Sequence, residues 1–114
     1  MEYIEQPDGS PEDQRLFERI QAQFPVKYTD LYSHISGEAV SSDISAYGLG
    51  MISGTEPQSS ADLEIWVNVP DQGQPLYARG RVVWCRPEGG KSYRMGIRLE
   101  NAELMRFSRV MRLH

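Results

Sequence analysis

The chain has 114 residues, a formal net charge of −4, 39% hydrophobic residues and 25% charged residues, a composition typical of one globular domain. The acidic balance argues against binding of a nucleic acid polymer, which requires a basic surface. No apolar run reaches the about 18–20 residues that cross a bilayer, and no signal peptide is visible, so we expect a cytoplasmic protein without membrane insertion.

The N-terminal segment predicts a flexible acidic tail over residues 1–14, followed by a single domain over residues 15–114. The tail holds five acids and no base. Within it, Ser10 is followed by Pro11 and, at the third position, by Asp13, a pattern typical of a helix start. A short helix would run to about Gln21 and end before Pro25.

Arg15 and Arg19 project together in either conformation that this segment can take. In a helix, residues four apart lie on one face. In an extended arm they share a side, because side chains alternate with a period of two. The sequence therefore presents two guanidinium groups side by side, although an R-x-x-x-R spacing alone is also met on ordinary solvated helix faces.

From Phe24 onward the pattern is one strand after another, separated by turns rich in Gly, Pro and Ser. The strands are expected over residues 26–32, 37–42, 49–53, 62–69, 76–86 and 93–99. Six short strands in so small a chain favour a mainly β fold, an antiparallel barrel or sandwich. Residues 102–113 carry Leu104, Phe107 and Met111 on one stripe, which predicts a C-terminal α-helix packed against the barrel.

Alternation also predicts which side chains face outward. Trp84 shares its face with Gly80 and Val82, which favours a position in the core over a ligand contact. Trp66 lies with polar neighbours, so it is interpreted either as a residue that contacts a partner or as one covered by the N-terminal segment. Outward positions are predicted for four arginines: Arg79, Arg81, Arg94 and Arg98. Arg94 is the best candidate among them for a ligand contact.

The C-terminal third is basic. Residues 79–114 carry nine bases against three acids. This asymmetry predicts a locally positive surface that suits a small anionic ligand or an acidic partner.

A second motif, D-x-S-x-x-G, runs from Asp43 through Ser45 to Gly48 and lies between two predicted strands. By itself it is compatible with a simple turn, since Asp and Ser bond nearby backbone and Gly adopts positive φ. Its Asp43 follows Arg19 by 24 residues. The two motifs, in this order on a β-rich chain, favour a binding site over two unrelated local features.

Together the motifs resemble those of the PilZ domain, the bacterial receptor module for cyclic di-GMP. The resemblance extends from residue 14 to residue 113, through the segment from Phe24 to Tyr28 and the predicted strands that contain Gly80 and Gly96. It implies a six-stranded antiparallel PilZ-type β-barrel with an N-terminal arm or short helix and a C-terminal α-helix. It also implies no cofactor beyond the ligand cyclic di-GMP, and a signal relayed by conformational change to an unidentified downstream protein.

The resemblance also implies a role for each motif residue. Arg15 and Arg19 would clamp phosphate or the O6 and N7 atoms of guanine. Asp43 would accept from guanine N1–H and the exocyclic amine, Ser45 would bond the base or a phosphate, and Gly48 would bring backbone close to the ligand. Additional contacts are predicted for three residues: Gln14, Trp84 and Arg94. Gln14 stands where many family members carry another arginine, a position that influences whether one ligand or an intercalated pair is bound.

Four other interpretations of the sequence are weaker. A degenerate PilZ-type adaptor that binds only protein would lack one of the motifs, and both are present. A single-stranded nucleic-acid barrel would need aromatic platforms along a basic groove. Catalysis is not expected, because Ser45 lacks the G-x-S-x-G elbow of a hydrolase. A metal site is not expected either, because Cys85 is the only cysteine and the two histidines lack partners at ligand spacing.

Overall fold

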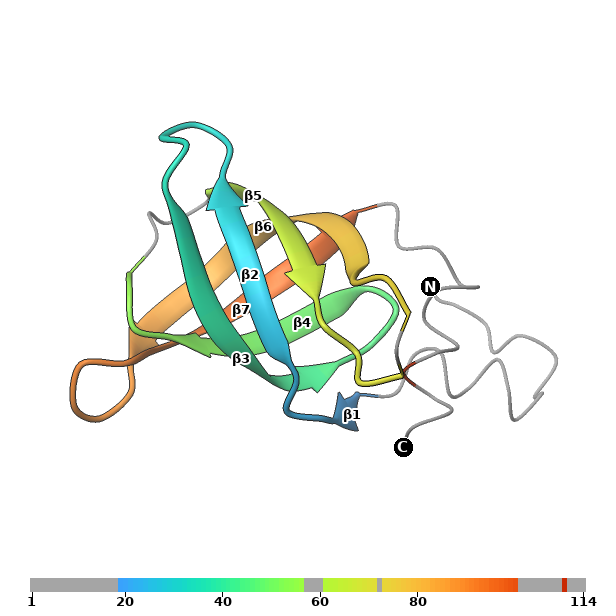
Figure 1. Cartoon of the computed structure of the whole chain (residues 1–114). Helices are drawn as coiled ribbons and strands as arrows, with labels where there is room; N and C mark the ends of the chain where they lie inside the picture. Colours follow the sequence, from blue (N-terminus) through green and yellow to red (C-terminus); the bar gives the residue numbers. More distant parts are fainter. Residues whose placement is uncertain (1–18, 57–60, 72, 101–109, 111–114) are drawn as a thin grey trace, which may run out of the picture.

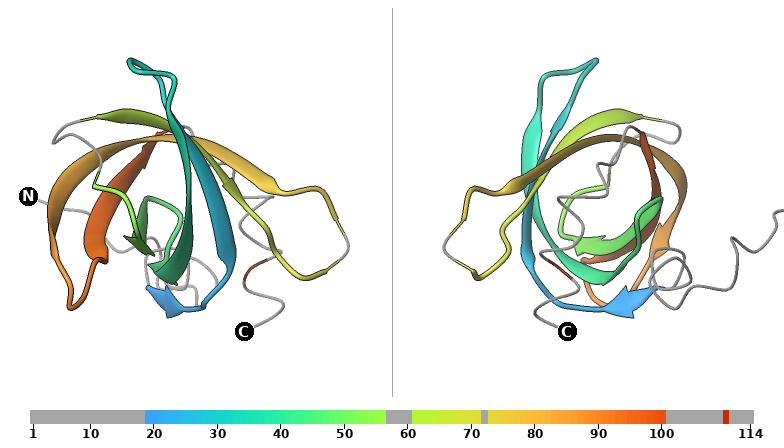
Figure 2. Two further views of the ribbon diagram at one scale, coloured as in Figure 1. Left: turned by 60° about the vertical axis from the view of Figure 1, so that its left-hand side comes forward. Right: turned by 90° about the vertical axis from the view of Figure 1, so that its right-hand side faces the viewer.

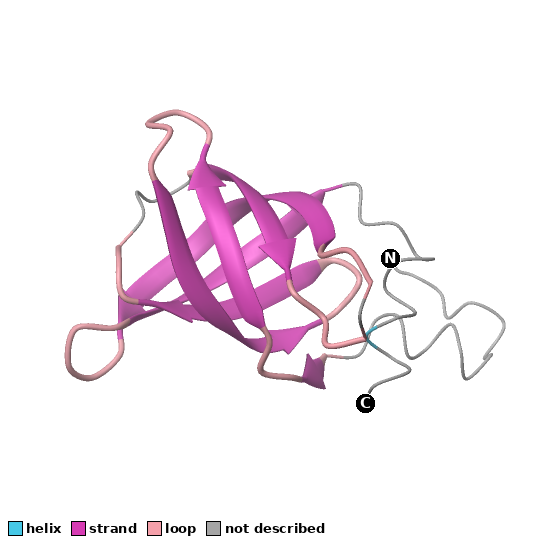
Figure 3. Ribbon diagram, in the orientation of Figure 1, coloured by secondary structure: helices cyan, strands magenta, loops and turns pink. Residues whose placement is uncertain are grey.

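The computed structural model describes residues 19–56, 61–71, 73–100 and 110, and strands dominate this part of the chain (Figure 1, Figure 3). The strands are β1 (Ile20–Gln21), β2 (Pro25–Asp30), β3 (Ser36–Ile44), β4 (Gly48–Ser53), β5 (Asp62–Val67), β6 (Leu76–Pro87) and β7 (Tyr93–Glu100). None of the described residues belongs to a helix with the length and hydrophobicity that a bilayer crossing requires.

The sheet closes into a six-stranded antiparallel barrel. The strand order is β1-β3-β2-β5-β6-β7-β4, and the additional pairing of β3 with β4 closes the six strands from β3 to β4 into a ring, with β1 paired to β3 outside it. The view along the barrel in Figure 2 shows the strands curving into a ring. Closure removes the unpaired edges that an open sheet exposes to other chains.

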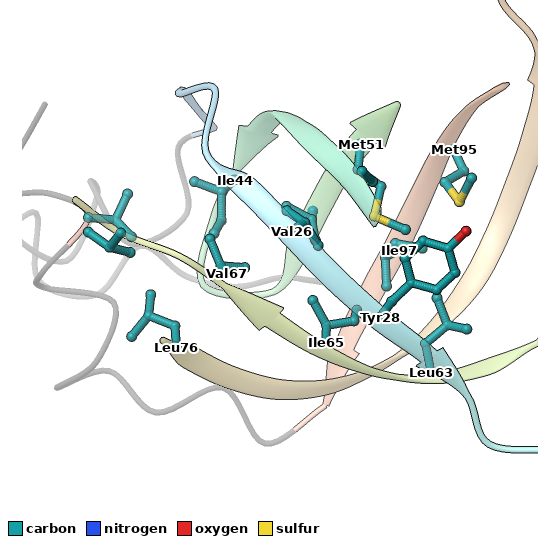
Figure 4. Close-up of a cluster of buried hydrophobic side chains, with 14 of the residues drawn as sticks. Val26, Tyr28, Ile44, Met51, Leu63, Ile65, Val67, Leu76, Met95 and Ile97 are labelled. Atoms are coloured by element: carbon teal, nitrogen blue, oxygen red, sulfur yellow. The ribbon is translucent and has the colours of Figure 1, made fainter. Parts of the chain in front are cut away.

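The core fills the inside of this ring because apolar residues alternate with polar ones along each strand. Buried side chains from every long strand meet there (Figure 4), among them Val26, Tyr28, Leu49, Met51, Leu63, Ile65, Met95 and Ile97. The buried hydroxyl of Tyr28 lies 2.9 Å from Oγ of Ser53, so this inward polar group has a hydrogen-bond partner.

The six predicted strands and the barrel are confirmed, with bounds shifted by a few residues. The prediction that the N-terminal helix reaches Gln21 is wrong. Ile20 and Gln21 form β1, which pairs with the end of β3, and Ile20 is buried. Pairing and burial outweigh helix propensity here. Residues 10–18 and the predicted helix 102–113 lie outside the described residues, apart from Val110, which is helical and buried in the core.

Two β-bulges interrupt the barrel, and each changes the direction of a side chain. On β3 the register shifts between Ser41 and Asp43, and on β6 it shifts between Val82 and Trp84. A bulge adds one residue, so the residues after it face the opposite side from the one that alternation assigns. Asp43 and Trp84 consequently point outward.

The predicted core position of Trp84 is therefore wrong. Val82 is buried as expected, but the bulge at Val83 turns Trp84 to the outer surface, where 43% of it is exposed. After the bulge it is Cys85 that pairs with the buried Met95 and packs against the core.

Candidate ligand-binding site

Arg19 begins the described chain, and a buried serine fixes the backbone that follows it. Ser41 points into the barrel, where its hydroxyl donates to the carbonyl of Ala22 and accepts from the amide of Phe24 at 2.9 Å. The amide of Ser41 in turn donates to the carbonyl of Phe24 at 2.9 Å. These hydrogen bonds hold the segment between β1 and β2 against β3. Arg19, which directly precedes β1, is therefore positioned beside the end of β3.

The charged residues of the two motifs meet in the folded chain. Nη1 of Arg19 donates to Oδ1 of Asp43 at 2.7 Å, with 53% and 31% of the two side chains exposed. A Cβ on Gly48 would stand 2.8 Å from Nη2 of Arg19. Glycine at position 48 thus leaves room for the guanidinium, which is a close approach rather than a need for positive φ.

A row of four residues crosses the outer wall of the barrel next to this pair. Asp43 on β3 is opposite Gly50 on β4, Gly50 is opposite Gly96 on β7, and Gly96 is opposite Trp84 on β6. Adjacent strands are about 4.8 Å apart, so the two glycines form a short track without side chains of its own between a carboxylate and an indole, and the neighbouring side chains cover it.

The side chains at both ends of the row lean over the glycines. A Cβ on Gly50 would stand 2.8 Å from Oδ1 of Asp43 and from Oγ of Ser42, and a Cβ on Gly96 would overlap Nε1 of Trp84. The bulges aim both Asp43 and Trp84 at this track. Oγ of Ser42, the residue that the bulge inserts in β3, is buried and has no hydrogen-bond partner among the described residues.

Ser45 belongs to the turn between β3 and β4 and is buried. Its amide donates to the carbonyl of Gly48 at 2.8 Å, and its Oγ accepts from the amide of Tyr47 at 3.3 Å. The structure therefore assigns Ser45 at least the turn-forming role. Its hydroxyl proton is not used in this bond and can still be donated.

Arginines surround the glycine track, as the basic C-terminal third predicts. Arg98 is opposite Gly48, and Arg94 is opposite Ile52 on the same outer face. The Cζ atom of Arg86 lies 5.0 Å from the centre of the Trp84 ring, which is a cation–π distance. The hydrogen bond that Arg94 donates to Glu88 is the largest cause that raises the pKa of Arg94, and the charge of Asp43 also contributes.

The structure thus brings together four predicted residues, namely Arg19, Asp43, Gly48 and Trp84, with Ser45 in the adjoining turn and Arg94 nearby. Arg15 and Gln14 lie outside the described residues. Gly50 and Gly96 were missed as site residues. In the sequence, Gly50 could have been recognised as a site residue because it follows Gly48 by two positions and so lies on the same face of a strand. Trp66 lies away from this row, on β5, with its ring centre 5.6 Å from that of Tyr77.

These features define a small β-barrel with an outer wall that is rich in arginine. The chain belongs to the PilZ domain family, because the family's sequence profile matches residues 13–111. No curated protein sequence matches the chain significantly.

Solved PilZ structures share the fold. The PilZ domain of CeSA from a cellulose-synthesizing bacterium is 21% identical, with a TM-score of 0.58 over 84% of this chain and 93% of that chain. The PilZ domain of YcgR from Escherichia coli, solved with c-di-GMP, is 18% identical, with a TM-score of 0.66 over 82% of this chain and 85% of that chain. The inhibitor of motility MotI from Bacillus subtilis is 15% identical, with a TM-score of 0.62 over 83% of this chain and 49% of that chain.

Proposed function

We propose that this chain is a receptor for cyclic di-GMP that holds the ligand on the outer wall formed by β3, β4, β7 and β6. The observation that carries the proposal is the 2.7 Å contact between Arg19 and Asp43, one residue from each motif, beside the glycine track. Membership of the PilZ family supports it, as does the related YcgR domain solved with c-di-GMP.

Each group around the track matches one part of the ligand. The guanidinium of Arg19 suits a phosphate or the O6 and N7 atoms of guanine, to which arginine donates two parallel bonds. The carboxylate of Asp43 accepts from guanine N1–H and the exocyclic amine. The exposed indole of Trp84 offers a flat surface for a base, with base–aromatic stacking worth about 1–3 kcal/mol. Gly50 and Gly96 leave the room that the Asp43 and Trp84 side chains occupy on this wall.

We assign Arg15 as the second arm of the clamp, although it lies outside the described residues, and Ser45 as a donor through its unused hydroxyl proton. Gln14 is assigned to the edge of the site, where it would influence whether one ligand or a pair is bound. No catalytic step is proposed, because a receptor needs only to bind and release.

Ligand binding would change the partner of Arg19. In the free chain Arg19 is neutralised by Asp43. A phosphate would take over Arg19 and leave Asp43 to the guanine edge, so both ends of the ion pair would be used. Because Arg19 directly precedes β1, the ligand would then tie the N-terminal segment to the turn between β3 and β4. A downstream protein would recognise that rearranged surface.

The test is isothermal titration calorimetry with cyclic di-GMP on the parent, on Arg19→Ala and on Arg81→Ala. Arg81 is a matched control, because it is also an exposed arginine paired with one carboxylate, that of Asp62 at 2.9 Å, and lies outside the row. Losing the Arg19 bonds should cost about 1.5–3 kcal/mol, or about 10- to 150-fold in affinity. Arg81→Ala should bind within about two-fold of the parent.

Equal affinities for Arg19→Ala and the parent would refute the clamp. If the parent itself released no heat and showed no ligand-induced rise in melting temperature, the receptor proposal would fail. The protein-only adaptor would then be the better account.

A further inference from the structure

The hairpin between β6 and β7, drawn in orange at the lower left of Figure 1, holds an acid at a fixed position. Gly89 and Gly90 turn the chain with φ of 47° and 59°, a region that favours glycine. The amide of Glu88 donates to the carbonyl of Ser92 at 2.8 Å, and the amide of Ser92 donates to the carbonyl of Gly89 at 3.2 Å. The backbone of Glu88 is thereby fixed at the base of the hairpin.

Both carboxylate oxygens of Glu88 accept hydrogen bonds from Arg94. Nε of Arg94 donates to Oε1 and Nη2 donates to Oε2, each at 3.0 Å. The hydrogen bond from Arg94 is the largest cause that lowers the pKa of Glu88, and the charge of Arg86 lowers it further. Arg86 and Arg94 are directly opposite on the two strands, so Glu88 relieves the repulsion between two like charges.

This cluster adjoins the glycine track. Arg94 precedes Gly96 by two residues and so shares its outward face of β7. Arg86 lies against the Trp84 ring that covers Gly96. Asp43, at the other end of the row, also contributes through its charge to the raised pKa of Arg94. Arg94 therefore lies between Glu88 and the place where the ligand would be held.

We propose that Glu88 is a resident anion that occupies Arg94 until a phosphate of the ligand replaces it, and that this competition limits the affinity of the site. The inference rests on the proposed receptor function. Its basis is chemical mimicry, since a carboxylate and a phosphate both present two oxygens to the guanidinium in the same side-by-side geometry. The exchange keeps Arg94 paired in both states, so only the difference between the two anions contributes to binding.

The experiment compares Glu88→Gln with Asp62→Asn, each titrated with cyclic di-GMP by calorimetry at low ionic strength. Both variants remove one exposed carboxylate from an ion pair with arginine, Arg94 in one case and Arg81 in the other. They therefore change the net charge equally. Melting curves confirm that each variant is folded.

Glu88→Gln should tighten binding about three-fold, the scale of an exposed ion pair, and added salt should reduce the gain. Asp62→Asn should change affinity by less than about 1.5-fold. A double variant, Glu88→Gln with Arg94→Gln, should show no gain over Arg94→Gln alone, because the freed residue is missing.

Equal gains in Glu88→Gln and Asp62→Asn would overturn the proposal, since net charge alone would then explain them. Weaker binding by Glu88→Gln would also overturn it, because Glu88 would then be holding Arg94 in its binding position. A gain that persists without Arg94 would do the same. If the parent fails to bind cyclic di-GMP, both the proposed receptor function and this inference are refuted. If the parent binds and Glu88→Gln shows no gain in affinity, this inference alone is refuted.

Discussion

Substituting Gly50 by alanine tests whether the glycine track sets the geometry of the site. The new Cβ would stand 2.8 Å from Oδ1 of Asp43 and from Oγ of Ser42, where ordinary contact begins at 3.4 Å. Both side chains must therefore move by about 0.6 Å, the difference between these distances. The atom displaced at Asp43 is the one that Arg19 holds at 2.7 Å, so the ion pair is disturbed together with the carboxylate that we propose binds the guanine edge.

The expected loss is a large part of one charged hydrogen bond, about 1.5–3 kcal/mol, which corresponds to a fall of about ten-fold or more in affinity for cyclic di-GMP. Stability should change little, because the displaced atoms are the ends of two short side chains and alanine restricts the unfolded chain slightly more than glycine does. Calorimetry gives the affinity and a melting curve gives the stability.

Gly54→Ala is the matched control, because a Cβ there meets nothing within 4 Å and its φ is not in the left-handed region. It should bind like the parent. The reasoning would be refuted if Gly50→Ala retained the parent's affinity while remaining folded, or if both alanine variants lost affinity equally.

Three further predictions concern the site and the core. Asp43→Asn, titrated with cyclic di-GMP and cyclic di-AMP, should lose most of any preference for guanine, since an amide no longer offers two accepting oxygens; an unchanged preference would contradict the assignment. Tyr28→Phe should lower the free energy of unfolding by about 1 kcal/mol in urea denaturation, because its hydroxyl bonds Ser53; unchanged stability would argue against that bond. Burial raises the pKa of the Cys85 thiol, so iodoacetamide should alkylate it more slowly at pH 8 in the folded protein than in urea, and equal rates would contradict its packing.

Alternation of apolar residues was enough to predict the six strands, because each strand buries one face and a shift by one residue would expose all of that face. The same rule failed at Trp84. A bulge inserts one residue without a clear sequence signature, and the position after it faces the other side. Asp43 follows a bulge too, and only the motif, not alternation, indicated that it belongs to the site.

The glycine track was not predicted as a unit because it depends on register. Gly50 and Gly96 are 46 positions apart in the printed sequence and become neighbours only through the pairing of β4 with β7. The sequence wrongly predicted a helix at Ile20 and Gln21 for a related reason. Ser10 and Pro11 are local signals, whereas Ile20 and Gln21 take their conformation from β3, to which they are bound by distant pairing.

The central claim is that the outer wall beside Arg19 and Asp43 is a specific receptor site for cyclic di-GMP. Calorimetric titration of the parent protein with cyclic di-GMP, in parallel with cyclic di-AMP and GTP, tests it most directly. The account predicts saturable binding of cyclic di-GMP at micromolar concentrations or below and at least ten-fold weaker binding of the other two, about 1.4 kcal/mol in free energy. The fitted stoichiometry would show whether one molecule or a pair is bound. Equal affinity for all three nucleotides, or no heat with any of them, would contradict the account.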